Sequence, residues 1–68
     1  MQPKTIGDRI RMLRIKKGLS VAEMAIQLNI TRAKIYSWES GKYEPGIRSV
    51  ALLSLFFNVT TDYLILGK

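Results

Sequence analysis

The sequence of 68 residues contains no cysteine and no histidine. Without cysteine, the chain has no disulfide to stabilise it and no thiolate to bind a metal ion. Without histidine, it lacks the commonest metal ligand and the commonest general base near neutral pH. Unbroken apolar runs reach only four residues, as at residues 50–53, so we expect no membrane-spanning helix. Residues 1–4 lead into no apolar segment, so we expect no secretory signal and a cytoplasmic location.

The chain is long enough for one domain only, and we expect that domain to span residues 1–68. Apolar residues make up 47% of the sequence, which is enough for a small hydrophobic core. The five carboxylates are scattered, and neither a nucleophile–base pair nor a glycine-rich phosphate loop is visible, which argues against an enzyme. We therefore expect a non-enzymatic domain with no cofactor, metal ion or small-molecule ligand.

Positive charge dominates and is unevenly distributed. Eleven basic and five acidic residues give a net charge of +6. Residues 1–48 contain ten of the bases and four of the acids, whereas residues 49–68 contain one of each and are otherwise largely apolar. A basic surface favours a polyanionic partner, most often nucleic acid, although basic residues can also serve solubility alone.

Helix start and stop residues recur along the chain and predict five short helices and no strand. Glycine and asparagine readily adopt the left-handed conformation that ends a helix, and serine and threonine cap helix starts. The stop residues are Gly18, Asn29, Gly41 and Asn58, and the expected caps are Thr5, Ser20, Thr31, Gly46 and Thr60. Three caps are flanked by apolar pairs at the spacing of a hydrophobic staple, namely Leu19 with Met24, Ile30 with Ile35, and Val59 with Leu64. The expected helices cover residues 6–17, 20–28, 31–40 and 47–57, and a fifth begins at residue 60.

Residues 20–39 predict a helix-turn-helix, because two short helices are joined there by a tight turn at residues 28–31. In the second of these helices Ile35 and Trp38 are spaced to face inward, which leaves a polar face to solvent. An arginine on such a face can form two hydrogen bonds to guanine, and an alanine methyl can contact thymine in the major groove. The alternative is an ordinary solvated helix face. The exposed residues are Arg32, Ala33, Tyr36 and Ser37, with Lys34 on the flank.

The chain resembles the Cro/phage-repressor (XRE-type) helix-turn-helix family over residues 5–67. The motifs that carry the resemblance are Ile6-Gly7-Asp8-Arg9-Ile10-Arg11, Lys17-Gly18-Leu19-Ser20, Leu28-Asn29-Ile30-Thr31, Ile35-Tyr36-Ser37-Trp38-Glu39-Ser40-Gly41-Lys42 and Asp62-Tyr63-Leu64. The resemblance implies an all-α, compact five-helix, lambda-repressor-like domain that binds double-stranded operator DNA as a dimer. It also implies base-reading positions at Arg32, Ala33 and Ser37, to which the exposed face adds Tyr36.

The same resemblance implies phosphate contacts from Thr31 and Lys42, and we add the flanking Lys34. At the start of the helix over residues 20–28 the family commonly has glutamine after the cap, whereas this chain has Val21. Ser20 and Val21 are therefore expected to offer a phosphate mainly a backbone N–H and the helix dipole. The resemblance also implies that Arg14 and Glu39 form a partly buried ion pair, the alternative being two unrelated surface charges, and Arg14 could also approach a phosphate.

In the helix over residues 47–57, residues 50–57 are apolar at every position but one, which predicts a homodimer. We expect a stripe of Ile47, Val50, Leu53 and Phe57 to face the core. The surplus apolar residues, Leu52, Leu55 and Phe56, together with Tyr63, Ile65 and Leu66, are expected to form the dimer interface. Two alternatives are deeper burial of this helix in the monomer and a different protein that covers the patch. The overall prediction is a sequence-specific repressor that binds a palindromic operator, and the alternative is a protein-interaction or antitoxin-type module that docks a partner through the last two helices.

Overall fold

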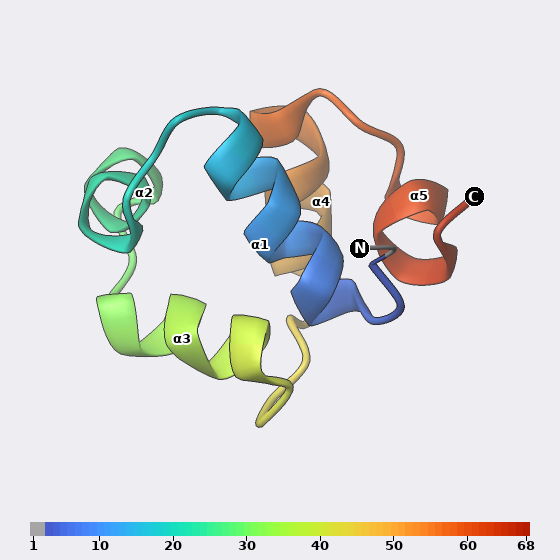
Figure 1. Cartoon of the computed structure of the whole chain (residues 1–68), viewed down its shortest axis with the longest axis horizontal. Helices are drawn as coiled ribbons and strands as arrows, with labels where there is room; N and C mark the ends of the chain where they lie inside the picture. Colours follow the sequence, from blue (N-terminus) through green and yellow to red (C-terminus); the bar gives the residue numbers. More distant parts are fainter. Residues whose placement is uncertain (1–2) are drawn as a thin grey trace.

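The computed structural model describes residues 3–68, so the first two residues of the predicted domain lie outside it. These residues form five helices and no strand, which confirms the predicted all-α architecture. Figure 1 shows α1 through the middle of the molecule, with α2 on one side, α5 on the other and α3 across one end. The helices are α1 (Ile6–Lys16), α2 (Val21–Leu28), α3 (Arg32–Ser40), α4 (Ile47–Phe57) and α5 (Thr61–Leu66).

The predicted caps begin each helix. The side-chain oxygens of Thr5, Ser20, Thr31 and Thr60 each accept a hydrogen bond from a backbone N–H three residues later. Gly46 begins α4 without such a bond, because glycine has no side-chain oxygen. Asn29 and Asn58 end α2 and α4 in the left-handed conformation, with φ of 56° and 54°. These local signals explain why the helix boundaries could be predicted within about a residue.

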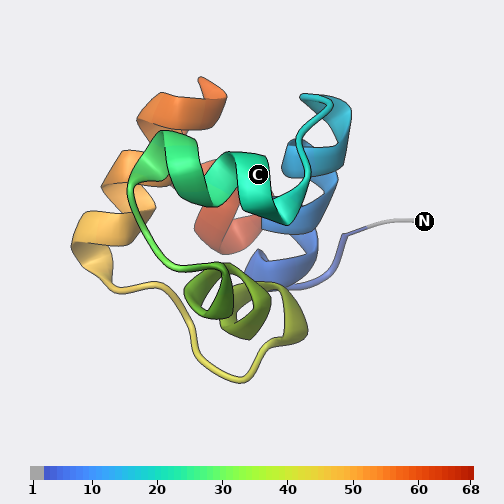
Figure 2. The same cartoon turned by 90° about the vertical axis from the view of Figure 1, so that its left-hand side faces the viewer.

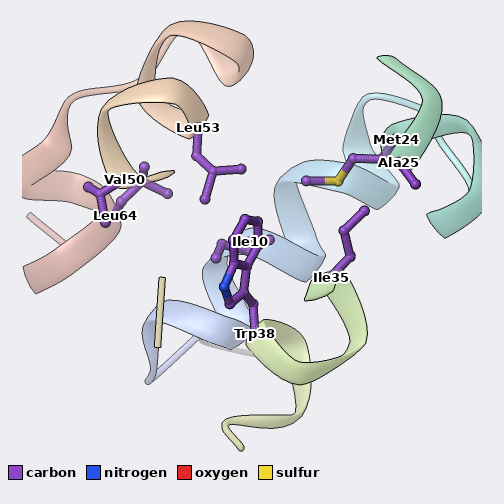
Figure 3. Close-up of a cluster of buried hydrophobic side chains, with 8 residues drawn as sticks. All are labelled: Ile10, Met24, Ala25, Ile35, Trp38, Val50, Leu53 and Leu64. Atoms are coloured by element: carbon purple, nitrogen blue, oxygen red, sulfur yellow. The ribbon is translucent and has the colours of Figure 1, made fainter. Parts of the chain in front are cut away.

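One cluster of buried side chains draws on all five helices (Figure 3). Trp38 from α3 lies beside Ile10 from α1, between side chains of α4 and α5 on one side and of α2 on the other. The three predicted staples each place their second residue in this core. The buried apolar residues are Ile10, Met24, Ala25, Ile35, Trp38, Val50, Leu53 and Leu64.

Helix α1 and helix α3 cross at Gly7. A side-chain carbon at this position would overlap the carbonyl oxygen of Trp38 and contact that of Glu39, so only glycine permits the close approach. The crossing fixes where α3 lies relative to the rest of the molecule.

Arg9 is buried, with 4% of its surface exposed, and the sequence analysis counted it only as a basic residue. Its Nε donates to the carbonyl oxygen of Leu64 and its Nη2 to that of Ile65, both at 2.8 Å. These carbonyls belong to the last turn of α5, where the helix lacks its own donors and the dipole favours a cation. Arg9 therefore fixes α5 to α1.

Two expectations for α4 were wrong. Ile47 was placed in the core stripe but is 89% exposed, because it lies in the first turn of α4, beyond the edge of the core. Phe56 was expected to point away from the core, but it packs against the core cluster, and the ammonium of Lys17 lies 5.2 Å from the centre of its ring. No helix of residues 3–68 is long and apolar enough to cross a membrane.

Candidate nucleic-acid interface

Helices α2 and α3 form a helix-turn-helix, as predicted. The turn is fixed by two backbone hydrogen bonds, from Asn29 N–H to Ile26 O at 3.2 Å and from Ile30 N–H to Ala25 O at 3.0 Å. Figure 2 shows the result, with α3 seen nearly end-on beneath α2. Because Asn29 is left-handed and Ile30 packs against the core, the direction of α3 is set by the turn itself.

The outer face of α3 carries the residues predicted to read bases. Arg32, Ala33 and Tyr36 are exposed and Ser37 is half-buried, whereas Ile35 and Trp38 on the opposite side are buried. Nothing in the described structure covers this face. It therefore presents a guanidinium, a methyl group and two hydroxyls on one side of one rigid helix.

The start of α2 is less available than the sequence suggested. The carboxylate of Glu23 accepts the backbone N–H of Ser20 at 2.9 Å, and the hydroxyl oxygen of Ser20 accepts the N–H of Glu23 at 3.0 Å. The first of these bonds, followed by the hydroxyl contact, lowers the pKa of Glu23, so this group is ionised near neutral pH. The N–H of Val21 remains without an intrahelical acceptor, as in the first turn of any helix. A phosphate at this end of α2 would meet the free N–H groups of Val21 and Ala22 next to a carboxylate.

The segment after α3 adds a second group of candidate phosphate ligands. Lys42 is exposed, and its ammonium lies 5.6 Å from the centre of the Tyr43 ring. The Tyr43 N–H donates to Ser37 O at 3.2 Å and so holds this segment against α3. A surface hollow of about 370 Å³ lies between α3 and this segment, with Thr31, Lys34, Tyr43 and Ser49 among its lining residues.

Tyr43 and Ser49 are candidate contacts that the sequence analysis missed. Both line the hollow, Tyr43 from the loop after α3 and Ser49 from the first turn of α4, and neither position stood out in the sequence. Arg11 is a third. It is exposed on α1 and lines a smaller hollow beside Tyr36, at the edge of the outer face of α3.

Arg14 and Glu39 form the predicted ion pair. Arg14 Nε lies 2.7 Å from Glu39 Oε2, and Arg14 Nη2 lies 3.0 Å from Glu39 Oε1. Arg14 Nη1 also donates to Leu19 O at 2.9 Å. The hydrogen bond that Arg14 donates to the Glu39 carboxylate raises the pKa of Arg14. Three of the five guanidinium N–H groups are thus used within the protein, and a phosphate contact by Arg14 stays a prediction.

Comparison with known proteins agrees with this geometry. A family model described as a helix-turn-helix domain matches residues 7–68. The transcriptional activator BcrR of Enterococcus faecalis is 39% identical over 62 residues, which are 91% of this chain and 30% of that protein. The prophage-derived regulator YonR of Bacillus subtilis is 39% identical over 61 residues, which are 90% of this chain and 56% of that protein. The chain thus spans about half or less of the length of these relatives.

A solved structure is similar over nearly the whole chain. The P22 c2 repressor, in complex with a synthetic operator, superposes with a TM-score of 0.86 at 28% identity, covering 94% of this chain and 97% of that one. The fold and the exposed face of α3 therefore define a lambda-repressor-like, non-enzymatic helix-turn-helix domain. The chain belongs to the helix-turn-helix family, in its phage-repressor type, which confirms the resemblance seen in the sequence.

Proposed function

We propose that this protein is a transcriptional regulator that binds double-stranded DNA in a sequence-specific manner, with α3 in the major groove. The observation that carries the proposal is the outer face of α3, which is polar, uncovered and fixed by the helix-turn-helix. A net charge of +6 supports a polyanionic ligand. The relatives' names as transcriptional regulators and the operator-bound neighbour support the same function. A cytoplasmic location, as the sequence analysis predicted, would give such a regulator access to DNA.

The residues divide into two roles. Arg32 forms two hydrogen bonds to guanine O6 and N7, and Ala33 contacts a thymine methyl. Tyr36 and Ser37 offer hydroxyls to neighbouring base edges. The phosphate contacts position the helix without reading sequence. These contacts come from Thr31, Lys34 and Lys42, from Ser20 and Val21 at the start of α2, and from the N–H groups that Arg14 does not use within the protein.

A homodimer on the solvent side of α4 would place two such helices on one operator. Ile47, Ala51, Leu52 and Leu55 are exposed along α4, and we call this surface the α4 face. A groove of about 480 Å³ beside it is lined by Ile65 of α5, among others. Burying a leucine or isoleucine fully contributes about 1.5–3 kcal/mol, so this surface can hold a dimer. A two-fold axis here would set the two α3 helices roughly 34 Å apart, matching a palindromic site.

This proposal keeps only some of the residues that the sequence predicted for the dimer interface. Leu52 and Leu55 lie on the α4 face, Ile65 lines the adjoining groove, and Leu66 is exposed on the outer side of α5. Tyr63 lines a different groove, between α5 and α1, and Phe56 packs against the core. We assign neither Tyr63 nor Phe56 to the dimer.

We propose repression as the mode of action, because a dimer bound to a palindromic operator blocks access to the DNA it covers. The operator-bound P22 c2 repressor supports this mode. A protein-interaction or antitoxin-type module is the second candidate, and the exposed α4 face favours it if that face binds another protein instead of a second copy.

Selection of bound duplexes from a random pool tests the proposal. A DNA-binding dimer returns a palindromic consensus with half-sites about 10 base pairs apart or a multiple of that. A consensus without symmetry would support sequence-specific DNA binding but contradict the proposed homodimer. Recovery of no consensus, together with binding that lacks a steep salt dependence, would overturn DNA recognition in favour of the interaction module.

A further inference from the structure

The outward side of α1 carries apolar residues that neither the core nor the DNA-binding face uses. Met12 is 42% exposed and Ile15 is 56% exposed. The core side of α1 is already supplied by Ile6, Ile10 and Leu13. A surface helix needs one apolar stripe only, so a second one indicates a further contact.

These residues line a groove between α1 and α5, which lie side by side (Figure 1). The groove has a volume of about 480 Å³ and is lined by Met12, Leu13, Ile15, Lys16 and Tyr63; we call it the α1–α5 groove. Its walls are held in place, because Arg9 binds the last carbonyls of α5 and the N–H of Tyr63 donates to the Thr60 hydroxyl at 2.9 Å. The groove is therefore a formed feature rather than the gap beside a loose helix.

The groove is separate from both surfaces assigned above. On α5, Tyr63 and Ile65 lie on either side of the buried Leu64, so Tyr63 lines this groove and Ile65 lines the one beside α4. Helix α3 meets α1 elsewhere, at Gly7 and through the Arg14–Glu39 pair. A partner in the α1–α5 groove would leave the outer face of α3 and the α4 face free.

The charge at the groove selects the kind of partner. Lys16 is the only charged residue among its lining residues, and no carboxylate of the described chain lines it. A second copy of this chain has eleven basic and only five acidic residues, so it offers few carboxylates to pair with Lys16. A segment with apolar side chains and carboxylates instead places an acid beside Lys16. The space between two helices suits a third, amphipathic helix.

We propose that the α1–α5 groove docks an acidic, amphipathic helix of another protein, so that the DNA-bound regulator carries a partner on this side. Met12, Ile15 and Tyr63 receive its apolar side chains, and Lys16 pairs with its carboxylates. The inference stands apart from the proposed DNA binding, because it uses none of the same residues.

Nuclear magnetic resonance with two synthetic peptides of about 15 residues tests it. One peptide carries leucines at positions i and i+4 flanked by glutamates, and the other has lysines in place of the glutamates. The acidic peptide should shift the signals of Met12, Ile15, Lys16 and Tyr63. Ile15→Glu should weaken its affinity by about tenfold or more. Lys16→Glu should reverse the preference between the two peptides, and the matched control Leu55→Glu, on the α4 face, should leave both affinities unchanged.

Other results overturn the proposal. Shifts confined to Arg32 and Lys34 would mean that the acidic peptide competes for the DNA-binding face. Equal affinity for both peptides, or no shift with either, would show that the α1–α5 groove does not select an acidic helix. Shifts at the groove with phosphatidylglycerol vesicles but not with the acidic peptide would assign it to a membrane. A dimer that dissociates with Ile15→Glu but not with Leu55→Glu would assign it to a second copy. The DNA affinity of Ile15→Glu should equal that of the wild type. A failure of the groove proposal can then be distinguished from a failure of the proposed DNA binding.

Discussion

The carboxylate of Glu39 in α3 receives two hydrogen bonds from the guanidinium of Arg14 in α1, at 2.7 and 3.0 Å. Only 12% of the Arg14 side chain and 9% of the Glu39 side chain are exposed. The pair joins α1 to α3 at a hollow beside Tyr36, at the edge of the outer face of α3, so it helps to set the position of the proposed recognition helix.

Glu39→Gln should lower the free energy of unfolding by about 3–5 kcal/mol, because it leaves the Arg14 cation mostly buried without its counter-charge. Urea denaturation measures this change. Glu44→Gln, at an exposed position, is the control and should change stability little. A loss below about 1 kcal/mol would show that the pair behaves like a surface ion pair.

Arg32→Ala should weaken binding to the selected operator by about 1–3 kcal/mol and relax the base preference at one position. Binding to random duplexes should change far less. Affinities for the operator and for a duplex of scrambled sequence, measured at one salt concentration, separate the two effects. An equal loss on both duplexes would make Arg32 a phosphate contact.

Lys42→Ala should weaken binding to all duplexes alike and reduce the slope of log affinity against log salt by roughly one unit. The reason is that an exposed lysine beside α3 neutralises one phosphate and releases its counterions. Lys68→Ala is the control, because it also removes one positive charge but lies at the far end of the sequence, and it should keep the wild-type slope. If both variants keep the wild-type slope, Lys42 does not contact the DNA backbone.

The pKa of Glu23 lies below its ordinary value, chiefly because its carboxylate accepts the backbone N–H of Ser20. Since the folded-state pKa is the lower one, this interaction stabilises the fold above the ordinary glutamate pKa of about 4.3 and is lost as pH falls through the folded-state value. Glu23→Gln should therefore show a smaller fall in Tm on acidification than the wild type. A carboxyl titration of Glu23 by nuclear magnetic resonance checks the cause, and an ordinary pKa there would contradict it.

Leu55→Glu should convert the proposed dimer into a monomer, because a charge would be buried at the centre of the α4 face. Leu55 is 82% exposed in the monomer, so the variant should keep its fold. Sedimentation equilibrium measures the change, with Ile15→Glu as a control of similar chemistry outside the interface. A variant that remains dimeric would move the interface off α4. Phe56→Glu is not suitable, because Phe56 packs against the core and the substitution would lower stability as well as disturb any interface.

The sequence predicted what local residues determine. Capping hydroxyls and left-handed asparagines act within a few positions, so the bounds of the helices and the helix-turn-helix could be read directly. The outer face of α3 followed from the spacing of Ile35 and Trp38. Ile47 was misplaced because helical periodicity gives the direction of a side chain but not how far the core extends beneath it.

Long-range contacts could not be predicted in the same way. Nothing near Arg9 in the sequence indicates that its acceptors lie 55 and 56 residues away. Tyr43 and Ser49 were missed because they line one hollow only through the bend between α3 and α4, whose shape depends on the tertiary structure. The Arg14–Glu39 pair was predicted from the family resemblance, and not from the spacing of the two charges.

The contact between Arg9 and α5 also orders events during synthesis. Arg9 leaves the ribosome before Leu64 and Ile65, whose carbonyl oxygens accept its hydrogen bonds and lie 55 and 56 residues later. Until these residues emerge, burying the guanidinium would leave a desolvated cation without acceptors. A nascent chain that stops before residue 64 therefore cannot complete its core, and α1 acquires its final environment only once α5 has been made.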